Sequence, residues 1–257
     1  MPELPEVETL CRQLQERVSG QRIKSTTVYD HKLDGIDDVC GQRIQNIRRL
    51  GKNILLMLDD GRSIVLHLRM TGRLLWRQGA KRETHTRWRL TIDDGNVDLV
   101  DPRRFATAKV LPTLIDKDTN DVMTGFDEKV FLTRQAVRNV SVKVLLMDPK
   151  AIAGIGNIYA CEILHRAGID PLRQAAKLNG SDWKKIIRIA RRILKKGIEK
   201  RGTSISDWRD LYGCQGENQH ELKVYGQEGK TCSKCRGVIM RIKQGGRSTF
   251  YCPQCQK

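Results

Sequence analysis

Apolar residues recur at helical spacing near the start of the chain, at positions 7, 10, 11, 14 and 18. This spacing predicts one amphipathic helix over residues 5–18, because Pro5 is tolerated in a first helical turn. From residue 22 to residue 111 the pattern changes to short apolar runs such as NILLML and SIVLHL, and the turn signal DDG occurs at 59–61 and 93–95. These runs predict a mostly antiparallel β-sandwich or barrel.

Helical patterns return in the second half of the chain. We expect one helix over about 133–147, a second that begins near Gly156 or Asn157, and a third from the N-cap candidate Ser181 to about residue 200. The segment 115–125 lacks apolar periodicity, which is typical of a linker between domains. Near the end of the chain, Gly245 and Gly246 separate two short runs within 238–251, which predicts a β-hairpin.

The charge of the chain indicates a polyanionic partner. Its 47 Lys and Arg residues exceed its 30 Asp and Glu residues, and the net charge is +17. Nucleic acid is the favoured partner, while an anionic membrane or an assembly partner stays open. No apolar run approaches the roughly 20 residues of a membrane helix, and the acidic start, MPELPEVE, differs from a secretory signal. We therefore expect a cytoplasmic protein with no membrane segment and no signal peptide.

Four of the eight cysteines are arranged as a metal site. Two C-x-x-C pairs, separated by sixteen residues, supply Cys232, Cys235, Cys252 and Cys255. Paired cysteines in a reducing compartment more often bind metal than form disulfides. Four thiolates are typical of a closed, structural zinc site without an open position for water. The pattern predicts one zinc ion per chain, and four unligated cysteines are the alternative.

The string PELPEVET, which begins at Pro2, resembles the N-terminal signature of the formamidopyrimidine-DNA glycosylases. Leu4 favours this branch over the endonuclease VIII branch. The motifs HLRMTG at 67–72, DPRRF at 101–105 and GIGNIYA at 154–160 follow in the family's order, before the closing cysteines. The resemblance implies a monomeric, nucleoid-associated repair enzyme for damaged double-stranded DNA. It would excise oxidised or ring-opened purines through a Schiff base on Pro2 and cleave the strand by β,δ-elimination.

The chemistry expected at the first residues is consistent with this resemblance. Removal of Met1 would leave Pro2 with a terminal amine, and such an amine with a pKa near 8 is roughly 10 to 30% unprotonated at neutral pH. Glu3 and Glu6 can then supply general acid–base steps. Acidic residues also complement the dipole at a helix start, which is the alternative for both. By the resemblance, Lys52 and Arg247 are assigned to the elimination steps.

The resemblance also implies a set of residues that hold or open the DNA. Three of them, Met70, Arg103 and Phe105, would fill the void left by the extruded base, although Met70 and Phe105 taken alone would be expected in a core. The glycine-rich turn at 154–157 is expected to offer backbone N–H groups to phosphate at a helix start. The DNA-binding candidates are His67, Met70, His85, Arg103, Phe105, Arg138, Lys143 and Asn157.

Together these patterns predict an α+β protein of two domains. The expected parts are an N-terminal β-sandwich domain with an N-terminal helix at 1–114, a linker at 115–127, a helical helix-two-turns-helix domain at 128–221 and a β-hairpin zinc finger at 222–257.

The sequence departs from the family pattern in the stretch 216–221. It reads GENQHE, where the family usually carries a glycine and a phenylalanine in a mobile loop over the flipped purine. Arg69 and Ala106 also stand where glycine is more usual. Lesion preference therefore stays open, and oxidised pyrimidines or hydantoins are alternative substrates. A non-catalytic damaged-DNA-binding homologue is the alternative from another class.

Overall fold

The chain packs as two units in a computed structural model, which describes residues 1–33, 35–36, 38–113 and 120–257. The first unit holds residues 1–116 and 197–219, and the second holds 117–196 and 220–257. Segment 197–219 therefore packs with the N-terminal unit, whereas the boundaries expected from the sequence follow chain order. Residues 115–119 of the expected linker lie outside the described residues.

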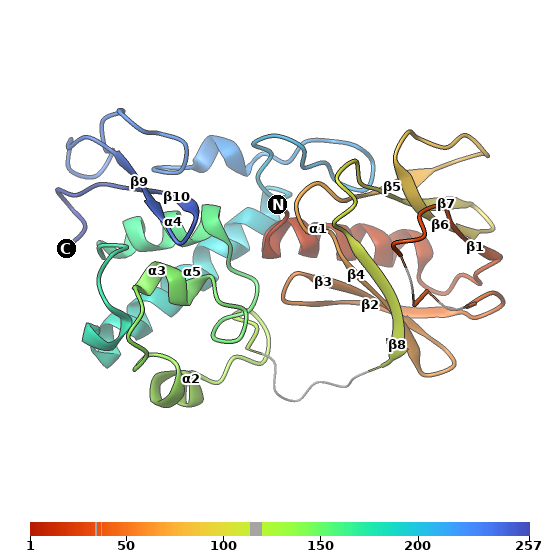
Figure 1. Ribbon diagram of the computed structural model, residues 1–257, viewed down its shortest axis with the longest axis horizontal. Helices are drawn as coiled ribbons and strands as arrows, with labels where there is room; N and C mark the ends of the chain where they lie inside the picture. The colour runs from red at the N-terminus through yellow and green to blue at the C-terminus, as the bar shows by residue number, and fades with distance from the viewer. Residues whose placement is uncertain (34, 37, 114–119) are drawn as a thin grey trace. The chain divides into compact units, whose positions relative to one another are not determined.

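The strands of the first unit form two antiparallel sheets (Figure 1). One sheet has the order β1-β6-β7-β5 and the other has the order β2-β3-β4-β8. The expected turns at Gly61 and Gly95 close the hairpins β3–β4 and β6–β7, and both glycines have positive φ. This confirms the β-sandwich. The strands are β1 (Ser25–Val28), β2 (Ile44–Leu50), β3 (Asn53–Leu58), β4 (Arg62–His67), β5 (Arg73–Arg77), β6 (Thr86–Ile92), β7 (Gly95–Val100) and β8 (Thr107–Pro112).

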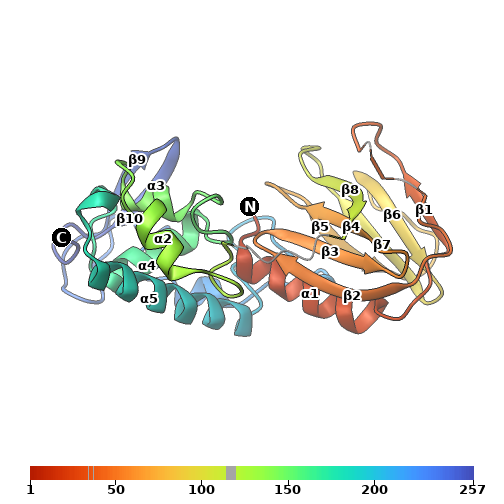
Figure 2. The same cartoon turned by 90° about the horizontal axis from the view of Figure 1, so that it is seen from below.

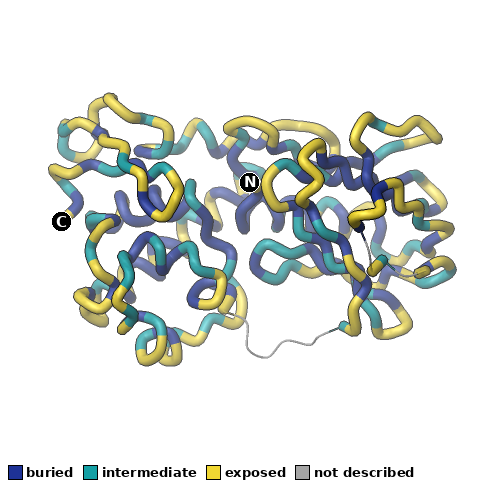
Figure 3. Tube along the Cα trace, in the orientation of Figure 1, coloured by how far each residue is buried: buried dark blue, intermediate teal, exposed yellow. Residues whose placement is uncertain are grey.

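Helix α1 (Leu4–Val18) packs against β2 and β3 (Figure 2). The apolar positions that predicted it, among them Val7, Leu10 and Leu14, are buried in one hydrophobic core with residues of both sheets. Helix and strands are largely buried along this unit, whereas many connecting loops are exposed (Figure 3). Burial of the apolar stripe, rather than the propensity of single residues, therefore holds α1 in place.

Segment 197–219 is attached to the first unit by polar contacts. The amide of Gln13 on α1 donates to Asp210 (3.1 Å) and accepts from the N–H of Leu211 (2.9 Å). The N–H of Trp76 on β5 donates to the carbonyl oxygen of Leu211 (2.7 Å). These bonds bring a segment from late in the chain beside the N-terminal helix.

The remaining elements are mostly helical. Strands β9 and β10 form the expected antiparallel hairpin, whose turn is made by Gly245 and Gly246, both with positive φ. No helix within the described ranges is both long and apolar enough to span a membrane. The elements are α2 (Glu128–Arg134), α3 (Val142–Leu146), α4 (Asn157–Ala167), the 3-10 helix η1 (Ala175–Lys177), α5 (Gly180–Glu199), the 3-10 helix η2 (Asn218–Glu221), β9 (Met240–Gln244) and β10 (Arg247–Tyr251).

Two local predictions are wrong. The single helix expected over 133–147 is interrupted between α2 and α3, where the N–H of Val142 donates to Arg173 (2.8 Å) and the carbonyl of Val140 accepts from Ala175 (2.8 Å). These tertiary bonds use backbone groups that a continuous helix would have paired internally. The N-cap of α5 is Asn179 rather than Ser181, because the Asn179 side chain accepts from the N–H of Asp182 (2.9 Å).

Candidate functional site

The start of α1 holds the predicted nucleophile and its two acidic partners. Pro2 is buried, and Glu3 and Glu6 are each 2% exposed. Glu6 Oε2 accepts a hydrogen bond from the N–H of Glu3 (2.7 Å), and this bond satisfies a free N–H at the helix end. The Glu3 side chain in turn accepts from the backbone N–H of Glu6 in a capping box, so the role expected of acids at a helix start is present for both residues. The bond from the N–H of Glu3 fixes the backbone directly after Pro2.

A segment that the sequence did not mark as functional also binds Glu6. The N–H of Thr203 donates to Glu6 Oε1 (2.7 Å), so both carboxylate oxygens accept hydrogen bonds. Gly202 packs so closely that a Cβ there would lie 2.7 Å from Glu6 Cγ. The amide of Asn218 donates to Thr203 Oγ1 (2.8 Å) and is buried with it. Segment 197–219 therefore fixes the position of the Glu6 carboxylate.

Gly216 marks the closest approach within this segment. A Cβ at Gly216 would lie 2.2 Å from the carbonyl oxygen of Gly202 and 2.5 Å from that of Arg201, so the backbone would have to shift. We expect Gly216→Ala to lower the free energy of unfolding by about 1 to 3 kcal/mol. Denaturant unfolding measures this change. Gly180→Ala is the matched control, because nothing lies within 4 Å of a Cβ at Gly180; equal losses in both variants would contradict the close packing.

Lys52 and His67 lie near each other in the first unit. Lys52 lies half-buried in the turn between β2 and β3, and His67 ends β4. Burial, together with the charges of Arg69 and Lys52, lowers the pKa of His67 to about 4, so its imidazole is neutral near pH 7. His67 Nδ1 accepts from the N–H of Arg69 (3.0 Å), and Arg69 has φ +56. Its left-handed backbone is the conformation that glycine adopts without strain.

Two of the three residues expected to fill the void are exposed apolar side chains. Met70 is 44% exposed and Phe105 is 51% exposed, although their residue types alone favoured a core. The guanidinium carbon of Arg103 lies 4.9 Å from the centre of the Phe105 ring. Met70 follows β4 and the other two precede β8, and β4 pairs with β8. The first unit therefore brings the loops that carry this trio to the same end of one sheet.

A buried carboxylate, Asp101, orders these two loops. It is 0% exposed and accepts from the backbone N–H groups of Phe105 (2.7 Å) and Ala106 (2.7 Å). Its other oxygen accepts from the hydroxyl of Thr71, which follows Met70 (2.5 Å). The sequence analysis placed Asp101 within a motif without assigning it a role. Its position shows that it fixes the loops from which Met70 and Phe105 project.

A second cluster lies in the second unit, where α3, α4 and β10 meet. Lys143 is fully buried, and its ammonium donates to Asn157 Oδ1 (2.6 Å) and Thr249 Oγ1 (2.6 Å). Asn157, the first residue of α4, donates to the carbonyl of Ser248 (2.9 Å), and Arg247 beside it is exposed. The fold thus brings together Lys143, Asn157 and Arg247 at a helix N-terminus, which favours anions.

The other two DNA-binding candidates lie in different surroundings. Arg138 forms an ion pair with Asp148 (2.7 Å). Burial is the largest single effect and raises the pKa of Asp148, but the hydrogen bonds and charges of Arg138 and Lys150 together outweigh it and lower that pKa. His85 is exposed with φ +67, and its carbonyl accepts from the N–H of Asp101 (3.0 Å). His85 therefore lies directly beside the loops that carry the void-filling residues.

The four clustered cysteines have the geometry of a metal site. Their sulfur atoms all lie within 4.8 Å of one another. Cys235 and Cys252 have sulfurs 3.4 Å apart, and the sulfurs of Cys232 and Cys255 are 3.9 Å apart. Tetrahedral zinc with bonds of about 2.3 Å places its sulfur ligands about 3.8 Å apart. The cluster therefore fits one structural zinc ion, as the spacing predicted.

Family models match three stretches of the chain. A formamidopyrimidine-DNA glycosylase N-terminal domain matches residues 1–108, and a formamidopyrimidine-DNA glycosylase H2TH domain matches residues 119–208. A zinc finger found in FPG and IleRS matches residues 229–257. The three stretches contain the expected catalytic, DNA-binding and zinc-binding residues, whereas Gly216 and Asn218 lie between the second stretch and the third.

Similar proteins share the full length of the chain. A formamidopyrimidine-DNA glycosylase of Desulfitobacterium hafniense is 37% identical and one of Carboxydothermus hydrogenoformans is 38% identical, each with 100% of both chains covered. A solved complex of the Lactococcus lactis Fpg with DNA that contains an abasic site is 32% identical, covers 100% of both chains and has a TM-score of 0.90. The chain belongs to the formamidopyrimidine-DNA glycosylase family.

Proposed function

We propose that this chain is a bifunctional DNA glycosylase of base excision repair, which excises oxidised or ring-opened purines and then cleaves the strand by β,δ-elimination. The observation that carries the proposal is the arrangement at the start of α1, where Pro2 adjoins Glu3 and the Glu6 carboxylate is fixed by two backbone N–H groups. The substrate class is supported by relatives, since solved Lactococcus lactis complexes contain Fapy-dG or abasic-site DNA.

The first chemical step uses the amine that Pro2 carries once Met1 is removed. Its lone pair forms a bond to C1′, and the bond from C1′ to the damaged base breaks with its electrons leaving on the base. The proton that the amine nitrogen then loses neutralises the departing base. Glu3 donates a proton to O4′ as the sugar ring opens, which leaves an iminium between the Pro2 nitrogen and C1′. Glu6 holds the Glu3 backbone, and its carboxylate orients water or relays a proton to the amine.

The iminium makes strand cleavage possible. It draws electrons from C2′, so a proton leaves C2′ and the 3′ phosphate departs in the β-elimination. Loss of a further proton then expels the 5′ phosphate in the δ-elimination. We assign proton donation in the first elimination to Lys52 and a role in the second to Arg247. The low pKa of His67 keeps that neighbour of Lys52 uncharged at neutral pH.

The exposed trio supplies the means to reach a base inside duplex DNA. A glycosylase must extrude the nucleotide, which costs a few kcal/mol of unstacking and unpairing. In the proposed role, Met70 and Phe105 enter the emptied stack, and Arg103 faces the orphaned base. The solvent exposure of both apolar side chains supports this role, since neither is among the buried residues of the described chain.

One feature of segment 216–221 favours a second candidate, the excision of hydantoins or oxidised pyrimidines. Asn218 is 5% exposed and is hydrogen-bonded to Thr203, so its side chain faces the interior of the segment. It therefore supplies no aromatic cover for a flipped purine. Contact between a base and an aromatic ring is worth roughly 1 to 3 kcal/mol.

Single-turnover incision of duplexes with different lesions tests the function and the lesion range together. We expect formamidopyrimidine to be excised at least several-fold faster than 8-oxoguanine opposite cytosine, because only the latter depends strongly on the missing cover. The cut ends should carry phosphate on both sides of the gap. Tight binding to every lesion without excision of any would instead identify a non-catalytic damaged-DNA-binding protein.

A further inference from the structure

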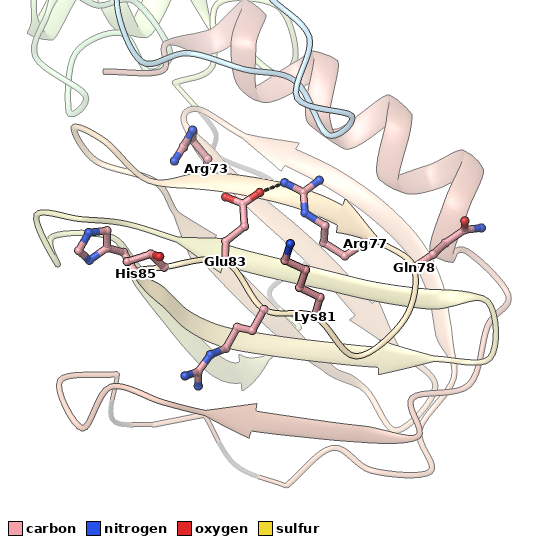
Figure 4. Close-up of a pocket in the computed structure, with 8 residues that line it drawn as sticks. Arg73, Arg77, Gln78, Lys81, Glu83 and His85 are labelled. Atoms are coloured by element: carbon pink, nitrogen blue, oxygen red, sulfur yellow. Dashed lines mark hydrogen bonds and ion pairs between the residues drawn. The ribbon is translucent and has the colours of Figure 1, made fainter.

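A basic hollow lies in the first unit beside the loop that joins β5 to β6. Its volume is about 650 Å³. Arg73, Arg77 and Lys81 line it together with one acid, Glu83 (Figure 4). His85, at the end of the loop, also lines it. The sequence analysis assigned a role only to His85.

Buried polar side chains hold this loop in a fixed shape. The guanidinium of Arg89 donates to the carbonyls of Ala80 (2.9 Å) and Lys81 (2.9 Å), and it is itself paired with the fully buried Asp98. The amide of Asn96 donates to the carbonyl of Gly79 (3.0 Å). The backbone of the loop is therefore fixed by the fold, and Lys81 projects from this fixed backbone.

The charges in the hollow are not balanced. Glu83 pairs with Arg77, and Arg82 lies over the ring of Tyr29 at 4.1 Å. Within the part of the chain that the structure describes, neither Arg73 nor Lys81 has a carboxylate within 4.0 Å. The hollow thus presents two cations, Arg73 and Lys81, that no carboxylate of the described residues neutralises, which is the chemistry of a site for a polyanion.

The hollow adjoins the loops that carry the void-filling residues. The carbonyl of His85 accepts from the N–H of Asp101 (3.0 Å), which in turn orders the loop of Phe105. Arg73 is paired with Val100 in the register of β5 and β7, and it follows Met70 by three residues. If Met70 and Phe105 insert into the duplex, the DNA backbone that flanks the lesion would therefore lie near this hollow.

We propose that the hollow binds phosphodiester groups of the substrate duplex beside the lesion, with Arg73 and Lys81 as phosphate contacts. The inference rests on the proposed function, since it takes damaged DNA as the substrate. Glu83 limits the affinity, because its carboxylate occupies Arg77 and repels phosphate. Each phosphate contact releases condensed counterions and adds about 0.9 to the slope of log affinity against log salt.

The test measures binding of the full chain to a duplex with a non-cleavable abasic-site analogue over a series of salt concentrations. We expect the combined variant Arg73→Ala and Lys81→Ala to reduce the magnitude of the slope by about 2, and Glu83→Gln to strengthen binding. The matched control removes two exposed cations on the other sheet, Arg48→Ala with Lys109→Ala, and should keep the wild-type slope.

Two results would refute the proposed phosphate-binding site in the hollow. One is an unchanged slope in the combined variant, and the other is an equal change in the control pair. A free anion as the true occupant would appear as stabilisation of the wild type, but not of the variant, by inorganic pyrophosphate while the slope for DNA stays the same. Incision of lesions by the wild type is measured alongside. Its absence would refute the proposed function without altering the comparison of slopes.

Discussion

Pro2→Gly is expected to lower the single-turnover rate of base excision about a hundredfold or more, which corresponds to about 2.7 kcal/mol of lost transition-state stabilisation. The proline ring fixes the backbone that carries the amine, and Glu6 holds the next residue through the N–H of Glu3 (2.7 Å). Glycine keeps an amine but removes this constraint, so fewer encounters place the nitrogen against C1′. The rate is measured with enzyme in excess over a lesion duplex.

Pro5→Ala is the matched control for this prediction. Pro5 lies in the first turn of the same helix, and its nitrogen is part of a peptide bond. The control should bind the abasic-site analogue and excise the lesion at nearly the wild-type rate. A Pro2→Gly enzyme as fast as the control would show that the constraint from the proline ring contributes nothing to the rate of excision.

Cys252→Ser is expected to remove the zinc ion and to weaken DNA binding at least about tenfold. Cys252 is fully buried, and structural zinc contributes about 10 to 16 kcal/mol to the folding of zinc-finger peptides. Without the ion, the support for β9 and β10 is lost, and with it the bonds from Asn157 and Lys143 to the residues beside Arg247. Metal analysis should find one zinc per wild-type chain and none in the variant.

Cys40→Ser controls for the loss of a thiol alone, because Cys40 is exposed and lies outside the cluster. It should retain one zinc and the wild-type affinity for DNA. Wild-type protein purified without chelator that contains no zinc, yet binds DNA tightly, would refute the structural role of the metal.

Local sequence patterns were sufficient to predict those elements whose structure depends on residues close in sequence. The apolar stripe of α1, the glycine turns of the hairpins and the cysteine spacing were all predicted, because each depends on residues close in sequence. The break between α2 and α3 was not predicted. It depends on pairing of Val140 and Val142 with residues 173–175, and such tertiary partners leave no mark on local periodicity.

In the candidate site, too, the local motifs could be recognised from the sequence, whereas the tertiary contacts could not. The chemistry of a terminal amine and the family resemblance of the motif selected Pro2, Glu3 and Glu6, but the bond from Thr203 to Glu6 could not be predicted. Its donor is a backbone N–H, which every residue except proline carries. Lys143 was selected as a surface contact to DNA, whereas its ammonium lies in a buried network that holds Asn157. The residue types at positions 143, 157 and 247 suggested an anion site, and only the packing revealed which neighbouring groups hold these side chains.

Borohydride trapping of the wild-type enzyme on a lesion duplex, followed by digestion and mass mapping of the adduct, identifies the nucleophile. Reduction converts the iminium to a stable amine, so the nucleophile stays covalently attached to the sugar. We expect loss of Met1 and a single adduct on the N-terminal peptide, at the nitrogen of Pro2. An adduct on a lysine, or incision without any trapped intermediate, would contradict this expectation.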